Sequence, residues 1–538
     1  MIAFEHALVL LLLTTLLNVL GRWLPWPQPI THAMGGVAAA IVPGFPTVAL
    51  DPGFFFLCFL PPLLFADGWL MPLREFFRAR RAILILAVGL VGFTTVAVGL
   101  ASYWLVPGLP LAMAFALGAV VSPTDAVAVS AITSRLKVPA RLVTILNGES
   151  LMNDATGLVA FKFALAALVA GTFSVTAIAA EFLVVSVGGL VVGLGVGYSV
   201  GRLRDLLRRV RSSDMSIEIT VSLMTPYIAY LAAEPLGVSG ILSVVAAGLY
   251  SGWRDPLRMD PETRQSAFAV WSIVIYWLNG LAFVMLGTQF PSLLHAVRGL
   301  YTPGQLALFV AVIGGVAIVA RIAWFFPGAY INCFLSRLAR KPEPTPPWQS
   351  VLVGSWAGMR GTVTLAAALS IPLTLQNGAP FPARDIVIFL AFGVIALTLL
   401  VQGTTLAWII QRLGLREDDS LAIEEKLART TAVDAGLKIL RSHESDSLSP
   451  EESAALGHVI AEYEHRLAEL GSEGETRASA ARRRGANRRF RLEALRAERS
   501  AVDDLWRRQI IGPDIHRPLQ QLLDHEESML APSAAAPH

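Results

Sequence analysis

Cysteine and charge are both scarce in this sequence. Only two cysteines occur among 538 residues, Cys58 and Cys333, and each lies in an apolar stretch. A disulfide framework and a cysteine-rich metal centre are therefore excluded, and we expect no cofactor. Charged residues make up 15% of the chain and hydrophobic residues 54%, whereas a soluble domain carries about 25% charged residues. A chain that is soluble throughout is excluded.

The few charges are unevenly distributed. Up to about Gln411 they are sparse and lie mostly between apolar runs, whereas beyond Arg416 they recur every few residues. This split predicts a transmembrane domain over residues 1–411 and a helical cytoplasmic tail over residues 412–530. The final segment, 531–538 (APSAAAPH), has a composition typical of disorder.

A helix of about 20 apolar residues crosses a bilayer. The first apolar run lacks a basic start and contains Glu5 and His6, so it is interpreted as a retained span and not a signal peptide. About thirteen spans are predicted by this length, near residues 2–20, 28–44, 52–67, 82–104, 110–132, 143–170, 179–200, 215–233, 238–251, 267–289, 304–333, 348–373 and 386–410.

Basic residues concentrate in alternate loops, and the intervening loops hold only Arg298 and Arg384. Because basic residues favour cytoplasmic loops, the pattern predicts a cytoplasmic tail and an N-terminus outside the cell. In the tail, Ser449 and Pro450 suit the start of a helix. The basic run at 481–496 is interpreted first as a solvated helix face. Contact with anionic lipid or another polyanion is the alternative, although no nucleic-acid partner is expected.

Ionisable side chains within the predicted spans are the strongest functional signal. Each costs about 2.5–3.5 kcal/mol at the bilayer centre, so it needs a partner or a water-filled cavity. The deep candidates are Asp67, Asp125, Glu149, Asp154, Lys162, Arg321 and Arg360. The structural alternative is that buried pairs among them only fix helix register.

Spacing separates these residues into faces. Residues four apart share a helix face, so Glu149 and Asn153 lie on one face and Ser150 and Asp154 on the adjacent one. Asp154 therefore lies beside neutral oxygen groups, which suit a hard cation. A partly desolvated carboxylate among them can hold either a proton or a small cation.

Two of the predicted spans are interrupted. Pro123 disfavours helix at Ser122, and Thr124 and Asp125 are good caps for the half-helix that follows. In the second span, three glycines frame Arg360, namely Gly354, Gly358 and Gly361. Two broken spans in corresponding halves are typical of secondary transporters built from inverted repeats.

The stretches LPPLLFADGW, SPTDAVAV, GESLMNDATGLV and GMRGTVTLA occur in this order. With them, the chain resembles the monovalent cation–proton antiporters of the NhaP/NHE type over residues 1–411, in particular bacterial members with a long cytoplasmic tail. The resemblance implies an all-α polytopic membrane protein of thirteen helices with inverted repeats and two broken, crossing helices. It further implies a homodimer in the bacterial inner (plasma) membrane, with dimerisation and core subdomains in each protomer.

The resemblance also implies roles for individual residues. Asp154 matches the acid that binds the transported Na+ or the proton. Further residues of the ion- and proton-binding site match Asn153, Asp125, Thr124 and Ser150, and Asn153 is the amide of the electroneutral branch. Glu149 and Arg321 match a structural salt bridge, and Arg360 matches an arginine that compensates helix-dipole ends.

Two deep candidates fall outside this pattern. Some relatives carry Glu one position before Asp67, where this chain has Ala66, so a gate role for Asp67 does not follow from the resemblance. Lys162 lies two turns from Asp154, about 12 Å along the helix. We expect it to extend to the interface or to pair elsewhere.

The predicted function is electroneutral exchange of Na+, or of K+ or Li+, for H+ by elevator-like alternating access, in pH and salt homeostasis and without enzymatic activity. A K+/H+ antiporter and a non-transporting sensor with the tail as output are the alternatives. A channel would need a filter motif, and a membrane aspartyl protease would need Gly-x-Gly-Asp; the sequence contains neither. The partner of the tail is not specified by the sequence.

Overall fold

The computed structural model describes most of the chain. The described residues are 2–24, 26–43, 45, 53, 57–133, 136, 138–170, 175–210, 214–338, 345–375, 379–415, 419–443, 449–471, 475–511 and 513–530. Within these ranges the secondary structure is helical apart from one isolated bridge between Thr374 and Pro380. The chain forms two compact units, Met1–Glu417 and Asp418–His538.

The first unit consists of helices of very different lengths. They are α1 (Ile2–Gly21), α2 (Gln28–Ile41), α4 (Leu60–Leu70), α5 (Leu73–Leu84), α6 (Val91–Leu105), α7 (Leu111–Val121), α8 (Ala126–Thr133), α9 (Ala140–Ala170), α10 (Val175–Arg209), α11 (Met215–Ala233), α12 (Gly240–Arg254), α13 (Pro261–Thr288), α14 (Phe290–Val297), α15 (Pro303–Leu338), α16 (Trp348–Trp356), α17 (Thr362–Leu369) and α18 (Arg384–Leu413). A π-helical segment, η1 (Ile85–Leu90), joins α5 to α6, and two 3-10 turns, η2 (Glu234–Leu236) and η3 (Asp255–Leu257), follow α11 and α12.

Eight described helical segments are long and apolar enough to cross a membrane. The all-helical, multi-pass character predicted from the sequence is therefore confirmed. Several elements at predicted spans are shorter, because they end at Pro, Gly or an interruption; α2 has 14 residues, α4 has 11 and α12 has 15. The total of thirteen spans and the inverted repeat remain predictions.

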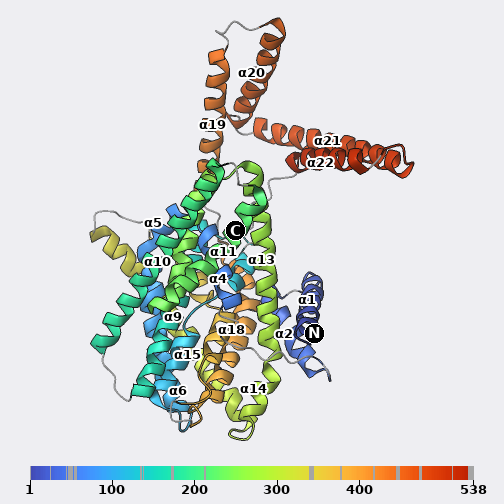
Figure 1. Ribbon diagram of the computed structural model, residues 1–538. Helices are drawn as coiled ribbons and strands as arrows, with labels where there is room; N and C mark the ends of the chain where they lie inside the picture. The colour runs from blue at the N-terminus through green and yellow to red at the C-terminus, as the bar shows by residue number, and fades with distance from the viewer. Residues whose placement is uncertain are drawn as a thin grey trace. The chain divides into compact units, whose positions relative to one another are not determined.

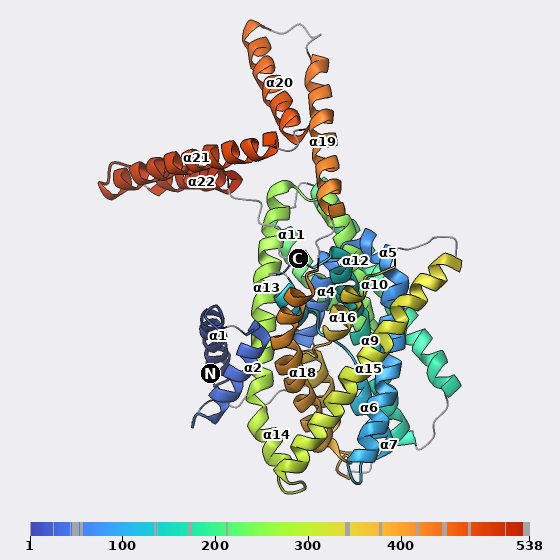
Figure 2. The same cartoon turned by 180° about the vertical axis from the view of Figure 1, so that it is seen from behind.

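The long helices run in roughly one common direction, with α1 and α2 beside α13 at one edge (Figures 1 and 2). Their buried apolar side chains form two clusters. The first is built mainly from α7, α15, α17 and α18, and the second mainly from α4, α12 and α13. Helix α9 contributes to both, with Phe161 in the first cluster and Leu151 in the second. It lies where the two clusters meet.

Both predicted helix interruptions are present. The first separates α7 from α8 at residues 122–125, where Pro123 cannot donate a backbone hydrogen bond. The second separates α16 from α17 at residues 357–361. The two irregular segments meet, because the Asp125 N–H donates a hydrogen bond to the Met359 carbonyl at 2.8 Å. Backbone groups that the breaks leave free are thus partly satisfied by each other.

The second unit contains α19 (Asp419–Ser442), α20 (Pro450–Gly471), α21 (Glu475–Arg507) and α22 (Pro513–Leu530). Helix α19 packs on α20, and α21 packs on α22 (Figure 1). The predicted start of α20 is confirmed by a capping box in which Ser449 Oγ accepts from the Glu452 N–H at 3.3 Å and Glu452 Oε2 accepts from the Ser449 N–H at 2.9 Å. The segment 531–538, predicted to be disordered, lies outside the described residues.

Candidate functional site

A small cavity lies where α4, α9 and α13 meet the two helix interruptions. The volume in which the centre of a water molecule fits is about 40 Å³. About 10–15 Å³ of such volume suffices for one water. The polar residues that line it are Asp67, Thr124, Asp125, Ser150, Asp154, Asn279 and Thr364. Three of these carry carboxylates, and no Lys, Arg or His is found among the described lining residues. The cavity therefore favours cations.

Asp154 is a carboxylate that the described part of the protein leaves without a partner, as it does Asp67 on α4. Its residue is 9% exposed, and it faces the cavity from the middle of α9. Among the described residues, none donates a hydrogen bond or forms an ion pair with its side chain. A desolvated carboxylate without a partner is costly, so the cavity leaves Asp154 to be neutralised by something that enters it.

Asp125 is held more firmly. Its Oδ1 accepts a hydrogen bond from the Val127 N–H at 2.8 Å, which caps the start of α8. Its carboxylate also packs against Gly361, the residue before α17, where an added Cβ would lie 2.4 Å from Oδ2. The carboxylate thus stands at two helix N-termini, whose positive dipole ends stabilise a negative charge.

Ser150 and Thr124 attach the first interruption to α9. Ser150 Oγ donates a hydrogen bond to the Thr124 carbonyl and accepts one from the Ala126 N–H at 2.8 Å. Both residues line the cavity, but the Ser150 hydroxyl is already engaged by the backbone. In this structure it positions the interruption.

Asn153 and Glu149 extend from the neighbouring face of α9, away from the cavity lining. Asn153 Nδ2 donates to Thr124 Oγ1 at 2.9 Å, and Thr124 Oγ1 donates to Glu149 Oε1 at 3.4 Å. Glu149 is paired with Arg321 through both carboxylate oxygens, and the Nη2–Oε2 bond measures 3.0 Å. Arg321 Nη2 also donates to the Gly354 carbonyl at 3.1 Å. This clamp joins α9, the first interruption, α15 and α16.

Arg360 is bound to backbone carbonyls. Its Nε donates to the carbonyl of Val121, the last residue of α7, at 2.9 Å, and its Nη1 donates to the Gly358 carbonyl. The backbone N–H of Arg360 donates to Thr398 Oγ1 at 3.3 Å. The buried guanidinium thus stands at the negative end of a half-helix, the geometry that dipole compensation requires.

Three polar lining residues, Asp67, Asn279 and Thr364, have no role that follows from the sequence. Asp67 on α4 lines the cavity although no role for it follows from the resemblance. Asn279 on α13 was missed, and its signal was a single amide within the apolar run YWLNGLAF. Lys162 is exposed and does not line the cavity, so it takes no part in the arrangement around Asp154.

Comparison with known proteins identifies similar chains. A family described as "Sodium/hydrogen exchanger, transmembrane" matches residues 8–412. A "Sodium, potassium, lithium and rubidium/H(+) antiporter" of Bacillus pumilus is 35% identical over 98% of this chain and 78% of its own length. An "Uncharacterized Na(+)/H(+) exchanger YjcE" of Escherichia coli is also 35% identical, over 98% of each chain.

A solved structure is similar as well. The sodium proton antiporter MjNhaP1 from Methanocaldococcus jannaschii superimposes with a TM-score of 0.60, covering 77% of this chain and 99% of MjNhaP1. The two chains are 18% identical, so the likeness concerns the fold.

Proposed function

This chain belongs to the sodium/hydrogen exchanger family, and we propose that it exchanges Na+ for H+ across the plasma membrane in pH and salt homeostasis. K+ and Li+ are proposed as further substrates, because a relative covering nearly the whole chain carries both ions in its name. If K+ is the physiological ion, the same site serves as a K+/H+ antiporter.

The observation that carries this proposal is the unpartnered Asp154 in a cavity with no basic residue among its described lining. Cation and proton each neutralise the carboxylate, and only one can do so at a time. The bare carboxylate is retained on its side of the membrane by the cost of moving a charge through low dielectric. Competition for one group therefore couples the two fluxes.

Elevator-like movement is supported by the position of the cavity between the two apolar clusters. The interruptions and α9 carry Asp125 and Asp154, whereas Asp67 lies on α4 in the second cluster. A sliding motion of α9, the interruptions and the first cluster against α4, α12 and α13 would carry Asp154 past Asp67 and expose it on the other side. Asp67 and Asn279 then act as additional oxygen ligands in one state only.

Electroneutral exchange is proposed because a single carboxylate binds the cation and the proton in turn. Asn153 is neutral and outside the lining, and Asp125 is stabilised by two helix N-termini in its anionic form. Asp67 lies on α4 in the second cluster and does not move with Asp154 in the proposed motion, so Asp154 is left as the exchanging group. One cation per proton follows from this arrangement.

The test is cation-dependent proton flux in proteoliposomes, measured with Na+, K+ and Li+ across a pH series. Asp154→Asn should abolish the flux while the protein remains a folded homodimer by size-exclusion chromatography. Asp260→Asn is the matched control, because Asp260 is exposed and makes no capping hydrogen bond. Proton flux that persists in Asp154→Asn would overturn the assignment.

Two further measurements address stoichiometry and orientation. Exchange that is electroneutral carries no current on solid-supported membranes, and a cation-dependent current would contradict one-for-one coupling. The proposed orientation, N-terminus outside and tail in the cytoplasm, predicts that protease added to intact spheroplasts leaves the tail uncut.

A further inference from the structure

Helix α5 carries an unusual density of positive charge. Within its 12 residues, Arg74, Arg78, Arg80 and Arg81 accompany a single acid, Glu75. All four arginines are exposed. Arg74 pairs with Glu75 at 3.9 Å, whereas Arg78, Arg80 and Arg81 have no acidic partner among the described residues.

The opposite face of α5 fixes which way the arginines point. Phe76, Ala79 and Ile83 are buried in the second apolar cluster. The contact with α9 is close at Gly148, where an added Cβ would lie 2.6 Å from Ile83 Cδ1. Because the buried face is locked against α9, α5 cannot rotate its arginines inward.

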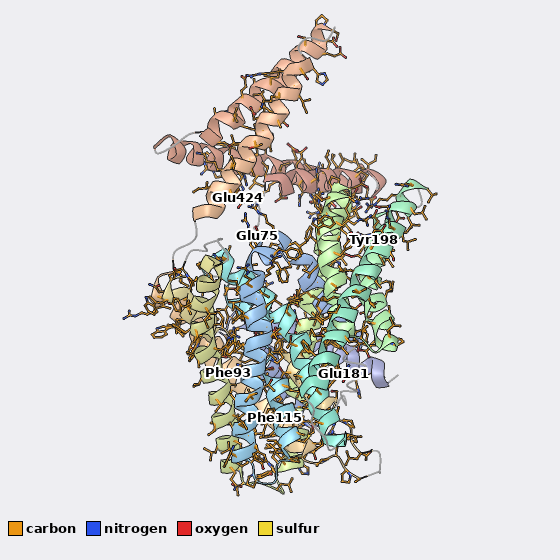
Figure 3. The ribbon with its side chains drawn as sticks, turned by 90° about the vertical axis from the view of Figure 1, so that its left-hand side faces the viewer. Glu75, Phe93, Phe115, Glu181, Tyr198 and Glu424 are labelled. Carbon is orange, nitrogen blue, oxygen red and sulfur yellow. The ribbon has the colours of Figure 1, made fainter. Side chains whose placement is uncertain are left out.

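The depth of the arginines follows from the rest of the helix. Helices α5 and α6 form one continuous span, Leu73–Leu105, of 33 residues. Figure 3 shows Glu75 near one end of it and Phe93 near its middle. Its exposed face carries an apolar stripe, made of Leu84, Val88, Phe93, Val96, Leu100 and Trp104. From Leu84 to Trp104 the helix rises about 30 Å, which matches the hydrocarbon thickness of a bilayer.

Beyond Leu84 the exposed face becomes basic. Arg81, Arg80 and Arg78 lie about 4.5–9 Å further along the helix, and each headgroup layer of a bilayer is about 5–7 Å thick. The three guanidinium groups therefore lie at the level of the lipid phosphates. The exposed Phe77, at 54%, lies one turn before Arg81 and is placed to enter the same interface.

The chemistry of the arginines specifies the partner. Arg78 and Arg81 are like charges three residues apart on the helix surface, so an anion bound beside them relieves their repulsion. A guanidinium binds phosphate oxygens through paired N–H groups. Clusters of basic residues next to a transmembrane helix attract anionic lipids. We propose that the arginine face of α5, formed by Arg78, Arg80 and Arg81, is a binding surface for the phosphate headgroup of an anionic phospholipid.

Thermal unfolding of the full-length protein in detergent tests this proposal, with phosphatidylglycerol as the probe. The lipid should raise Tm in a concentration-dependent manner, because it binds the folded protein. Phosphatidylcholine and free glycerol phosphate should raise it little. An equal effect of phosphatidylcholine would overturn charge recognition, and an equal effect of glycerol phosphate would overturn a lipid site.

Two triple variants locate the surface. The variant R78Q/R80Q/R81Q should lose more than half of the Tm rise, whereas R78K/R80K/R81K, which keeps the charge, should retain most of it. Both variants should match the wild type in Tm and elution volume without lipid, because the substituted side chains are exposed. A Tm rise in the glutamine variant equal to that of the wild type would mean that the lipid binds elsewhere, and the proposal would fail.

Discussion

Removing the charge of Glu149 is the most direct test of the clamp beside the cavity. Glu149 and Arg321 are each 1% exposed, so water cannot screen the pair or replace it. In Glu149→Gln the side chain keeps its shape and one acceptor oxygen. Its amide NH2, however, meets the donors of Arg321 where a carboxylate oxygen accepted them, and a buried cation remains without its counter-charge.

Breaking a buried pair by removing one partner costs about 3–5 kcal/mol. We expect a value near the lower end, about 3 kcal/mol, because Arg321 retains three favourable contacts. They are the remaining acceptor at position 149, the Gly354 carbonyl at 3.1 Å and the ring of Phe325, whose centroid lies 5.4 Å from the guanidinium carbon. For a unit of this size the loss corresponds to a fall in Tm on the order of 5 °C.

The assay is thermal unfolding of purified protein in detergent, followed by tryptophan fluorescence. Glu75→Gln is the matched control, since its pair with Arg74 spans 3.9 Å and Glu75 is 42% exposed, so its loss costs less than about 1 kcal/mol. The double variant E149Q/R321Q should be more stable than E149Q, because no charge is left unpaired. A Tm of E149Q equal to that of the wild type, with transport lost, would refute a structural role and indicate a direct one.

Gly361→Ala should slow cation-dependent proton flux by at least about tenfold, because the new Cβ would lie 2.4 Å from Oδ2 of Asp125. Gly315→Ala, which meets no heavy atom within 4 Å, should keep the wild-type rate. In the tail, a hydrogen bond from His516 on α22 at 2.9 Å holds the pKa of Asp503 on α21 below its ordinary value. The contribution of this bond to the stability of the folded tail is therefore complete near neutral pH, and it is lost as pH falls through the lowered pKa of Asp503. Hydrogen exchange of α22 should therefore be faster in Asp503→Asn than in the wild type at neutral pH, with the difference shrinking toward about pH 3; a difference independent of pH would contradict this.

Local features of this fold follow from the sequence because they depend on neighbours. Pro123 lacks a backbone donor, and α7 ends two residues before it. On α9, the helical period alone directs Ser150 and Asp154 to the cavity lining. The same period directs Glu149 and Asn153 to the clamp on the neighbouring face.

Features that depend on distant segments do not follow from spacing. Glu149 and Arg321 are 172 residues apart, and their pairing was expected only from the family resemblance. Asp67 and Asn279 reach the cavity because α4 and α13 pack beside α9, which no local pattern encodes.

The π-helical segment between α5 and α6 is equally hidden in the sequence. Helix α15 contacts it, because the Trp324 Nε1–H donates to the Ile85 carbonyl at 3.2 Å. The Trp324 ring also occupies the space beside Gly89, where a Cβ would lie 2.5 Å from it. A partner 239 residues away thus stabilises a backbone form that is rare on its own.

The buried cations explain why the proposed exchange needs a mobile ion. Arg321 is bound to Glu149 and the Gly354 carbonyl, and Arg360 is bound to carbonyls at both interruptions. Neither guanidinium can neutralise Asp154 without leaving a buried carboxylate or two helix ends unsatisfied, at a cost of several kcal/mol. These two buried arginines therefore stay bound to Glu149 and to backbone carbonyls, and neither of them pairs with Asp154. Under the proposed mechanism, this leaves a proton or a metal cation as the partner of Asp154, and coupling follows because the two cannot bind it together.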